Sequence, residues 1–171
     1  VQLISGKIDT LDPRQAYDTS SSELIENMYE TLITYKGNDL KGFQPTLATA
    51  LPSISGDKKQ YTFNLRKGVK FHSGNSFSCK DVRYTYLSVL ISGNSDSWAW
   101  FMRDSLLNTA NDPKTDKIPW NKVSNTIVCK SDYQVTFNLA KVDPAFLAKL
   151  AFTNGGIIDS QFAIKLGEWS G

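Results

Sequence analysis

The chain has 171 residues, 19 of them Lys or Arg and 17 Asp or Glu, so its formal net charge is +2. This near balance, without a polybasic tract, excludes the electrostatic footprint of a nucleic-acid-binding protein. The hydrophobic fraction of 40% and aromatic fraction of 12% are those of a globular chain. No apolar run approaches the roughly 20 residues of a membrane-spanning helix. The sequence therefore predicts one or two small folded domains.

The first forty residues predict a strand, a bend, a helix and a second strand. Residues 1–4 suit a strand, and Pro13 biases Asp12 away from helical geometry. Ser20 and Glu23 have the spacing of a capping box, which predicts a helix start there. The apolar residues on one face of this helix are Ile25, Met28, Tyr29 and Leu32. A short strand at 32–35 and a return at 42–50 follow.

Residues 61–86 carry the clearest pattern. Tyr61, Phe63 and Leu65 alternate with polar residues, as in a half-buried strand. A loop at 73–76 separates them from a helix that Ser78 caps, with Asp81 three residues later. The residues on one face of this helix are Cys79, Val82, Tyr86 and Val89.

The second half continues the mixture of helices and strands. We expect a loop at 92–97, a helix around Trp98 to Leu107, a polar excursion at 111–119, and strands at 123–129 and 133–139. Asp143-Pro144 predicts a helix start, and Gly155-Gly156 ends that helix. Ile157-Ile158 would be a last strand, and Asp159 would cap a helix to Leu166. The fold class is therefore α+β, with a mixed, mostly antiparallel sheet.

Catalytic and metal sites find little support in the sequence. His72 is the only histidine, and neither a nucleophile nor an orienting partner is evident near it. Cys79, Cys129 and His72 are too few and too scattered for a structural zinc site. No glycine-rich phosphate-binding motif occurs. We expect no catalytic residue, no metal and no cofactor.

Four landmarks in order carry a resemblance to a known family. They are Leu11-Asp12-Pro13, residues 27–32, the segment Pro45-Thr46-Leu47-Ala48, and residues 61–86. Together they resemble family 5 of the extracellular solute-binding proteins of ABC importers, the peptide and nickel binders. The resemblance fades after about Gly156. Cys79 departs from it, because the family usually has a small residue such as alanine there.

The resemblance implies a two-lobed fold of the type II periplasmic-binding-protein kind, cluster C. Residues 1–41 would be the amino-terminal part of ligand-binding lobe I, 42–153 an inserted α/β subdomain, and 154–171 the return into the lobe. Family members are much longer, so this chain is expected to be an amino-terminal fragment. Its flanking pieces would pack against each other or pair with a second copy, and a half-cleft would bind ligand weakly.

The resemblance also implies a function: non-covalent binding of peptides and their delivery to a membrane permease. The expected location is periplasmic or otherwise extracytoplasmic, with or without a lipid anchor. Nickel chelates and oligosaccharides remain alternative ligands. A receptor or sensor of the same fold is a second possibility, and a hydrolase with catalytic residues outside the chain is a third.

Four residues are candidates for ligand binding. In peptide-binding relatives the loop that matches Tyr17, Asp18 and Thr19 lines the cleft, and its main chain pairs with an extended ligand. An ordinary polar loop before a helix is the alternative. In relatives an aromatic residue at the position of Trp98 reaches over the ligand. Trp98 and Trp100 cannot share one helical face, and we expect Trp98 to be the outward one, with core packing as the alternative.

The cysteines and Phe63 give further expectations about the core. Free cysteines are among the most buried residue types, and we predict that Cys79 and Cys129 are two buried, reduced thiols. A disulfide is chemically allowed in an exported protein, but the sequence does not establish that the two are close. Phe63 is expected to be a core residue of its strand.

Overall fold

The structure is a computed structural model that describes residues 6–37, 39–91, 98–109, 118 and 120–169. The helices are α1 Thr19–Met28, α2 Cys79–Ile91, α3 Ala99–Leu107, α4 Trp120–Val123, α5 Phe146–Ala151, the 3-10 helix η1 Thr153–Gly155, and α6 Ser160–Lys165. The strands are β1 Ile33–Lys36, β2 Asp39–Pro45, β3 Ser53–Ile54, β4 Gln60–Asn64, β5 Ile127–Ser131 and β6 Gln134–Asn138. The predicted α+β class is confirmed. The strand expected at 1–4, the loop at 92–97 and most of the excursion at 111–119 lie outside the described residues.

An antiparallel sheet with the strand order β3-β4-β6-β5 forms one side of the molecule, and β1 and β2 form a separate antiparallel pair. In the central pair Phe63 lies opposite Val135, and the rings of Phe63 and Phe137 meet edge to face, 6.0 Å apart. Both phenylalanines are fully buried. The alternation seen in the sequence therefore marks the core face of the sheet, and the prediction for Phe63 is confirmed.

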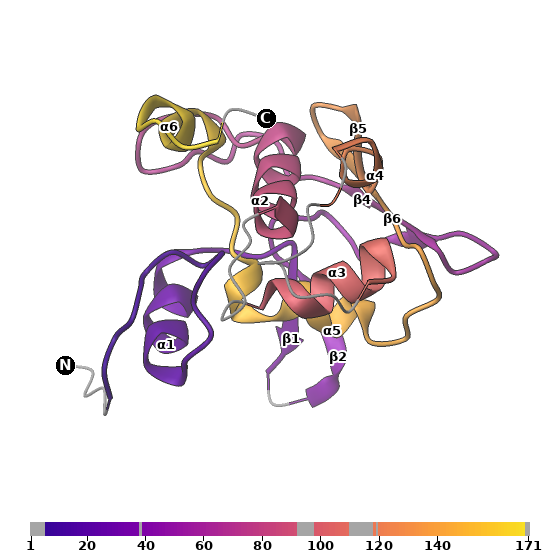
Figure 1. Ribbon diagram of the computed structural model, residues 1–171, viewed down its shortest axis with the longest axis horizontal. Helices are drawn as coiled ribbons and strands as arrows, with labels where there is room; N and C mark the ends of the chain where they lie inside the picture. Colours follow the sequence, from indigo (N-terminus) through magenta and orange to yellow (C-terminus); the bar gives the residue numbers. More distant parts are fainter. Residues whose placement is uncertain (1–5, 38, 92–97, 110–117, 119, 170–171) are drawn as a thin grey trace.

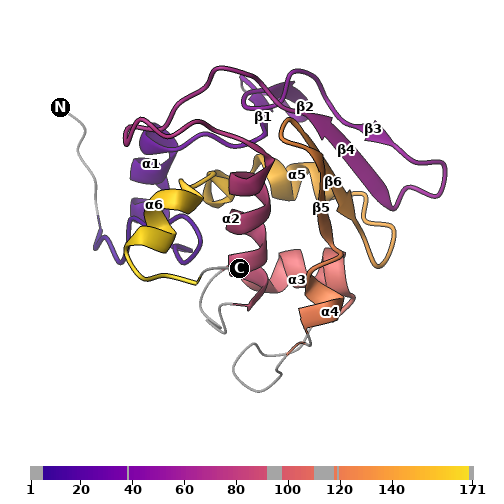
Figure 2. The same cartoon turned by 90° about the horizontal axis from the view of Figure 1, so that it is seen from above.

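Helix α2 runs through the middle of the molecule, with the sheet on one side and α1 and α6 on the other (Figures 1 and 2). It is buried almost all round, including the predicted face of Cys79, Val82, Tyr86 and Val89. Asp81 belongs to the buried side and accepts hydrogen bonds from the Ser78 main-chain N–H and from the Ser160 N–H and hydroxyl. A helix buried on every side is the natural centre of a small α+β fold.

The prediction of two reduced thiols is wrong, because Cys79 and Cys129 form a disulfide with a Cα–Cα distance of 5.8 Å. The first turn of α2 packs directly on the β5–β6 hairpin, and the Cys79 N–H donates to the Asp132 carbonyl at 2.7 Å. This contact sets the two cysteine backbones at a separation that a disulfide spans without strain. The bridge joins positions 50 residues apart in the sequence.

Several predicted element boundaries shift. Helix α1 begins at Thr19, and Asp18 caps it by accepting the Ser21 N–H at 2.8 Å, so the capping box expected at Ser20 and Glu23 does not form. Met28 is half exposed rather than part of a buried face. By contrast, Asp159 caps α6 as predicted, accepting the Phe162 N–H at 3.0 Å.

The segment expected to be a last strand, Ile157-Ile158, is buried but belongs to no sheet. The Ile157 N–H donates to the Glu30 carbonyl at 2.9 Å, and the Ile158 N–H donates to the Thr85 hydroxyl at 3.1 Å. One of these hydrogen bonds goes to a loop carbonyl and the other to a helix side chain, and neither is part of strand pairing. The segment therefore crosses from η1 to α6 along the surface of α2 without entering a strand ladder.

Candidate functional site

The loop before α1 is a compact turn organised by Asp12. Its carbonyl accepts the N–H groups of Gln15 and Ala16 at 3.0 and 3.1 Å, and its carboxylate accepts the Arg14 N–H at 2.9 Å. Pro13 restricts the backbone within this turn. The turn fixes the path of the chain as far as Ala16, and the Asp18 cap fixes it again at the start of α1.

Tyr17 lies between the Asp12 turn and the Asp18 cap, and no hydrogen bond within the described residues holds it. Its side chain is 53% exposed. Among the described residues, Tyr17 makes no hydrogen bond through its main chain or its phenol. Exposed backbone groups in a loop held at both ends are available to pair with an extended ligand strand.

Asp18 and Thr19 have different roles from Tyr17. The Asp18 carboxylate caps α1, and its hydrogen bonds from the main chain and side chain of Ser21 lower the pKa of Asp18 below its usual range. Its second oxygen, Oδ2, is buried and has no hydrogen-bond partner within the described part of the chain. Thr19 is exposed at the first position of the helix. Asp18 is therefore a structural group of the loop, whereas Thr19 remains accessible.

Trp98 is not the outward-facing residue that we expected. It is fully buried, whereas Trp100 is 49% exposed. The Trp98 ring packs between Tyr86 of α2, at 6.1 Å, and Phe101, at 5.3 Å. The two tryptophans do face opposite ways, as the helical spacing requires. The contact with α2 selects Trp98 as the inner one, because α3 packs its first turn against that helix.

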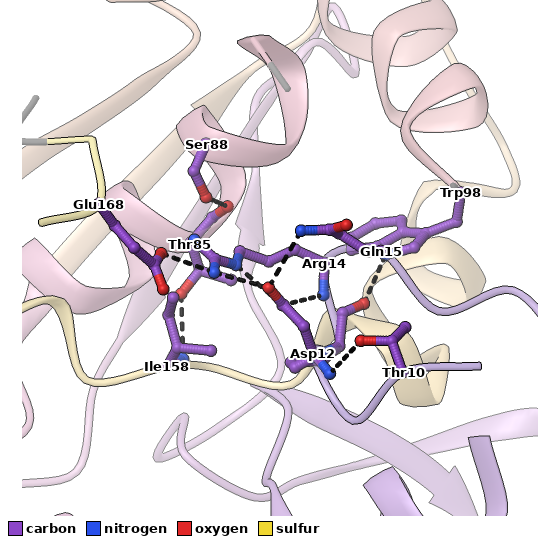
Figure 3. A network of polar contacts seen from close by, with 10 residues as sticks. Thr10, Asp12, Arg14, Gln15, Thr85, Ser88, Trp98, Ile158 and Glu168 are labelled. Atoms are coloured by element: carbon purple, nitrogen blue, oxygen red, sulfur yellow. Dashed lines mark hydrogen bonds and ion pairs between the residues drawn. The ribbon is translucent and has the colours of Figure 1, made fainter. Parts of the chain in front are cut away.

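The structure nevertheless brings Trp98 to the candidate loop. The Trp98 Nε1–H donates to the carbonyl of Pro13 at 2.8 Å (Figure 3). A buried indole N–H needs a partner, and here the partner belongs to the turn that precedes Tyr17. Trp98 thus reaches the candidate site through the main chain of the loop and not through a surface of its own.

Asn154, which the sequence did not single out, holds the same loop from a second side. It is fully buried in η1, and its Nδ2 donates to the Ala16 carbonyl, while its Oδ1 accepts the Ser22 hydroxyl at 3.2 Å. A lone amide between apolar residues and a glycine pair was the only signal available. Its partner is 138 positions away in the sequence, so no local pattern could identify the contact.

Ionic contacts attach the loop to the C-terminal part of the described chain. The guanidinium of Arg14 binds the carboxylate of Asp12 at 2.9 and 2.7 Å and that of Glu168 at 2.7 Å (Figure 3). Burial alone would lower the pKa of Arg14, but these two carboxylates outweigh it and raise the pKa above its usual value. The arginine is therefore charged at any relevant pH, and it joins segments that are far apart in the sequence.

A hollow of about 1000 Å³ lies at the other end of α1. Its walls come from residues 26–30, Leu47, residues 69–73, Phe77 and the segment from Ile157 to Glu168. Leu11, Asp12 and Arg14, from the loop before α1, also line it. Tyr17, Asp18, Thr19 and Trp98 do not line it. His72 lies at its edge, and the imidazole makes no hydrogen bond within the described residues, so it lacks the orienting partner of a general base.

No three His, Cys, Asp or Glu side chains in the described ranges are grouped closely enough to hold a metal ion. No helix within those ranges is long and apolar enough to cross a membrane.

A family model and individual relatives both match this chain. Residues 42–168 match the family model described as "Bacterial extracellular solute-binding proteins, family 5 Middle". The di/tripeptide-binding protein 2 of Pseudomonas aeruginosa is 30% identical over 141 residues, which cover 75% of this chain and 25% of the relative.

Solved structures show the same fold. An oligopeptide-binding protein of Borrelia burgdorferi matches 96% of this chain and 32% of its own, with a TM-score of 0.80 and 22% identity. The protein DppA of Helicobacter pylori, in complex with the peptide STSA, matches 92% of this chain and 30% of its own, with a TM-score of 0.66 and 26% identity. The predicted type II periplasmic-binding-protein architecture is thereby confirmed. The chain spans about a third or less of the length of these relatives.

Proposed function

Because the chain belongs to family 5 of the bacterial extracellular solute-binding proteins, we propose that it contributes one wall of a peptide-binding cleft in an ABC importer's binding component. The binding is non-covalent, and the closed, liganded form is presented to a membrane permease. Closure of this kind shifts an existing equilibrium through the ligand's higher affinity for one state. The chain acts as a binding module and not as an enzyme.

The free main chain of Tyr17 is the observation that carries this proposal. Its N–H and carbonyl are held in place by Ala16 and Asp18 on either side, yet both groups lack a partner among the described residues. Main-chain pairing supplies affinity whatever the ligand's side chains, which suits a protein that takes peptides of varied sequence. Thr19, exposed two residues further along, is the neighbouring side chain that contributes to the same surface.

Two comparisons support a peptide as the ligand class. The Pseudomonas relative is named for binding di- and tripeptides, and the Helicobacter structure contains a tetrapeptide. Peptide therefore ranks above nickel chelates and oligosaccharides.

The proposed division of the chain follows from this function. Residues 1–41 and 154–171 belong to the lobe that carries the peptide-binding loop, and 42–153 form the inserted subdomain. The family-model match begins at residue 42, which supports the first of these boundaries. Trp98 and Asn154 reach the loop from the other two parts and join them to it. A lipid anchor and self-association find no support among these contacts, and neither is proposed.

The disulfide supports an extracytoplasmic location. Family members are extracellular or periplasmic, and bridges such as Cys79–Cys129 persist in oxidising compartments but are rare in the cytosol. A folded core that depends on this bridge is suited to the outside of the cytoplasmic membrane. We propose that location for the protein.

Nuclear magnetic resonance on the ¹⁵N-labelled 171-residue chain tests the proposal at the low affinity expected of one wall of a cleft. Adding tri-alanine to about 10 mM, a range that detects a Kd near 1 mM, should shift the amide signals of Tyr17, Asp18 and Thr19. Tyr17→Ala should preserve these shifts, because the main chain is unchanged. Tri-alanine with N-methylated peptide bonds should not produce them. Shifts confined to the hollow, around Met28 and Phe162, would instead place the ligand at the other end of α1.

A further inference from the structure

We propose that Trp98 and Asn154 are positioning residues, whose buried side-chain donors hold the Pro13 and Ala16 carbonyls and so set the main chain of Tyr17 for ligand. The consequence for ligand rests on the proposed function. The consequence for the order of the loop does not, and it can be measured without any ligand.

Each of the two buried donors has the loop carbonyl as its hydrogen-bond partner, so movement of the loop would leave the donor unpaired. Trp98 and Asn154 are both fully buried, so neither the indole N–H nor the amide N–H can turn to bulk water if the loop moves away. A buried donor left without a partner costs more free energy than an exposed one. The loop is therefore held by the penalty for opening as well as by the bonds themselves.

The hydrogen bonds within the turn, from Arg14, Gln15 and Ala16 to Asp12, give the turn its shape but do not attach it to α3 or η1. Within the turn, the Asp12 carbonyl alone accepts both internal main-chain bonds, from Gln15 and Ala16. Arg14 attaches the start of the turn to Glu168, whose side chain is 39% exposed. The two buried donors act at Pro13 and Ala16, and Ala16 is the residue that directly precedes Tyr17.

Both donors belong to one packed block. Phe101 lies in α3, three residues after Trp98, and its ring packs on the ring of Phe152 at 5.7 Å. Phe152 lies two residues before Asn154, so this contact connects the neighbourhoods of the two donors. The ammonium of Lys149 in α5 also donates to the Phe101 carbonyl at 3.0 Å. Because α3, α5 and η1 are joined in this way, the Pro13 and Ala16 carbonyls are held at a fixed spacing, and the loop takes its shape from that block.

Trp98→Phe tests the inference, because it removes the N–H donor and keeps an aromatic ring. Native-state amide exchange should become about tenfold faster at Gln15 and Ala16, the scale of losing one buried hydrogen bond. The amides of Leu65 and Leu139, which donate to Tyr133 and Lys59 in the sheet region, should stay within about twofold of their original rates. Trp100→Phe is the matched control, because Trp100 is exposed and should change none of these rates.

The outcomes separate positioning from simple core packing. Acceleration at all four amides, or loss of folding, would show that Trp98 is only a core residue and would overturn the inference. Unchanged rates at Gln15 and Ala16 would overturn it as well. Asn154→Asp, which keeps the acceptor for Ser22 and removes the donor, should reproduce the local acceleration at Ala16.

A ligand titration then links the loop to binding. The tri-alanine shifts at Tyr17 should need about five- to tenfold more peptide in Trp98→Phe than in the unaltered chain or in Trp100→Phe. If exchange accelerates locally but the unaltered chain shows no shifts at Tyr17, the proposed function fails while the positioning contacts stand. If peptide binding is unchanged despite a loosened loop, positioning for ligand is refuted and the proposed function survives.

Discussion

The sheet with α2 and the pair of end segments, residues 6–31 and 154–169, are held together in different ways. In the sheet region, large apolar side chains such as Phe63, Tyr86 and Phe137 are fully buried, and a disulfide crosses from α2 to β5. In the end segments the fully buried groups are fewer, and polar contacts such as the Arg14–Glu168 ion pair and the Asn154–Ala16 hydrogen bond join the two segments. The exposed large hydrophobic residues of the end segments are Ile8, Leu11, Tyr17, Met28, Phe162, Ile164 and Leu166.

Because of this difference, the sheet region and the end segments should contribute differently to the global free energy of unfolding and to local opening. Burial of apolar area and a covalent bridge determine the free energy of unfolding of the sheet region. The order of the end segments depends on a few hydrogen bonds and ion pairs, each contributing about 1 kcal/mol. The part of the chain that carries the candidate loop should therefore open locally at a lower free energy than the part that carries the core.

Removing the disulfide should have the largest effect. Replacing both partners, Cys79→Ala with Cys129→Ala, should lower the free energy of unfolding by about 4 kcal/mol, the chain-entropy value for a loop of this size. The bridged residues are 50 positions apart. Urea unfolding with and without a reductant measures the loss. A change below about 1 kcal/mol would mean that the packing of α2 on β5 suffices without the bridge.

A largely buried ion pair between α3 and α5, outside the end segments, should have the next largest effect. Lys149 in α5 binds Asp143 at 2.7 Å, and the Ser105 hydroxyl donates to the same carboxylate at 2.5 Å. Although burial alone would raise the pKa of Asp143, the hydrogen bonds from Lys149 and Ser105 outweigh it and lower the pKa. Asp143→Asn should cost about 2–3 kcal/mol, because it leaves the ammonium without its main counter-charge.

Lys141 supplies the matched control for that pair. Its ammonium binds Asp104 at 2.5 Å, but both side chains are at least a third exposed. Lys141→Ala should therefore change the free energy of unfolding by less than about 1 kcal/mol. Equal losses of unfolding free energy in the two variants would show that burial does not make the Asp143–Lys149 ion pair more stabilising than the exposed Asp104–Lys141 pair.

The parts that the sequence predicted correctly depend on local signals. Alternation at Tyr61, Phe63 and Leu65 located the central strand, and the spacing from Cys79 to Val89 located the buried side of α2. The Asp159 cap of α6 was likewise readable, because a capping side chain lies beside the helix that it caps. Each of these signals lies within one element, so tertiary packing did not need to be known.

The errors arise where distant segments meet. Nothing local distinguishes a disulfide from two buried thiols, since the bridge depends on α2 packing on β5. The helical spacing showed that Trp98 and Trp100 face opposite ways, but only the contact with Tyr86 decides which one is buried. Asp18 caps α1, and its predicted contact with ligand stays a prediction. Of the predicted site, Tyr17 and Thr19 keep the accessibility expected of ligand-binding residues, and the role proposed for them remains a prediction.

A smaller effect than that of Asp143→Asn is predicted where the two regions meet, at Asp159. Its carboxylate accepts the Ser73 hydroxyl at 2.5 Å and the Asn75 amide at 3.1 and 2.9 Å, so it ties the loop before α2 to the start of α6. Burial would raise the pKa of Asp159, but the hydrogen bonds from Ser73, Phe162 and Asn75 outweigh it and lower the pKa. A carboxyl whose folded-state pKa is depressed stabilises the fold above its unfolded-state pKa, about 3.9 for aspartate. That stabilisation is lost as the pH falls through the lower, folded-state value.

Asp159→Asn isolates the stabilisation that depends on the carboxylate's charge, because asparagine caps a helix about as well as aspartate. The variant should lose about 1 kcal/mol of unfolding free energy at pH 7, the scale of a charge-assisted hydrogen bond that is partly exposed. As the pH falls below the unfolded-state pKa of about 3.9 the loss should shrink, and it should vanish once the carboxyl is protonated in the folded chain as well. Urea unfolding of both chains at pH 7, 4 and 2.5 measures the difference at each pH and cancels the other titrating groups. Ser73→Ala should show the same pH dependence with a smaller amplitude, because it removes one of the donors and keeps the charge. A difference that stays constant over this range would mean that the end segments are attached here by packing around Asp159 and not by its charge.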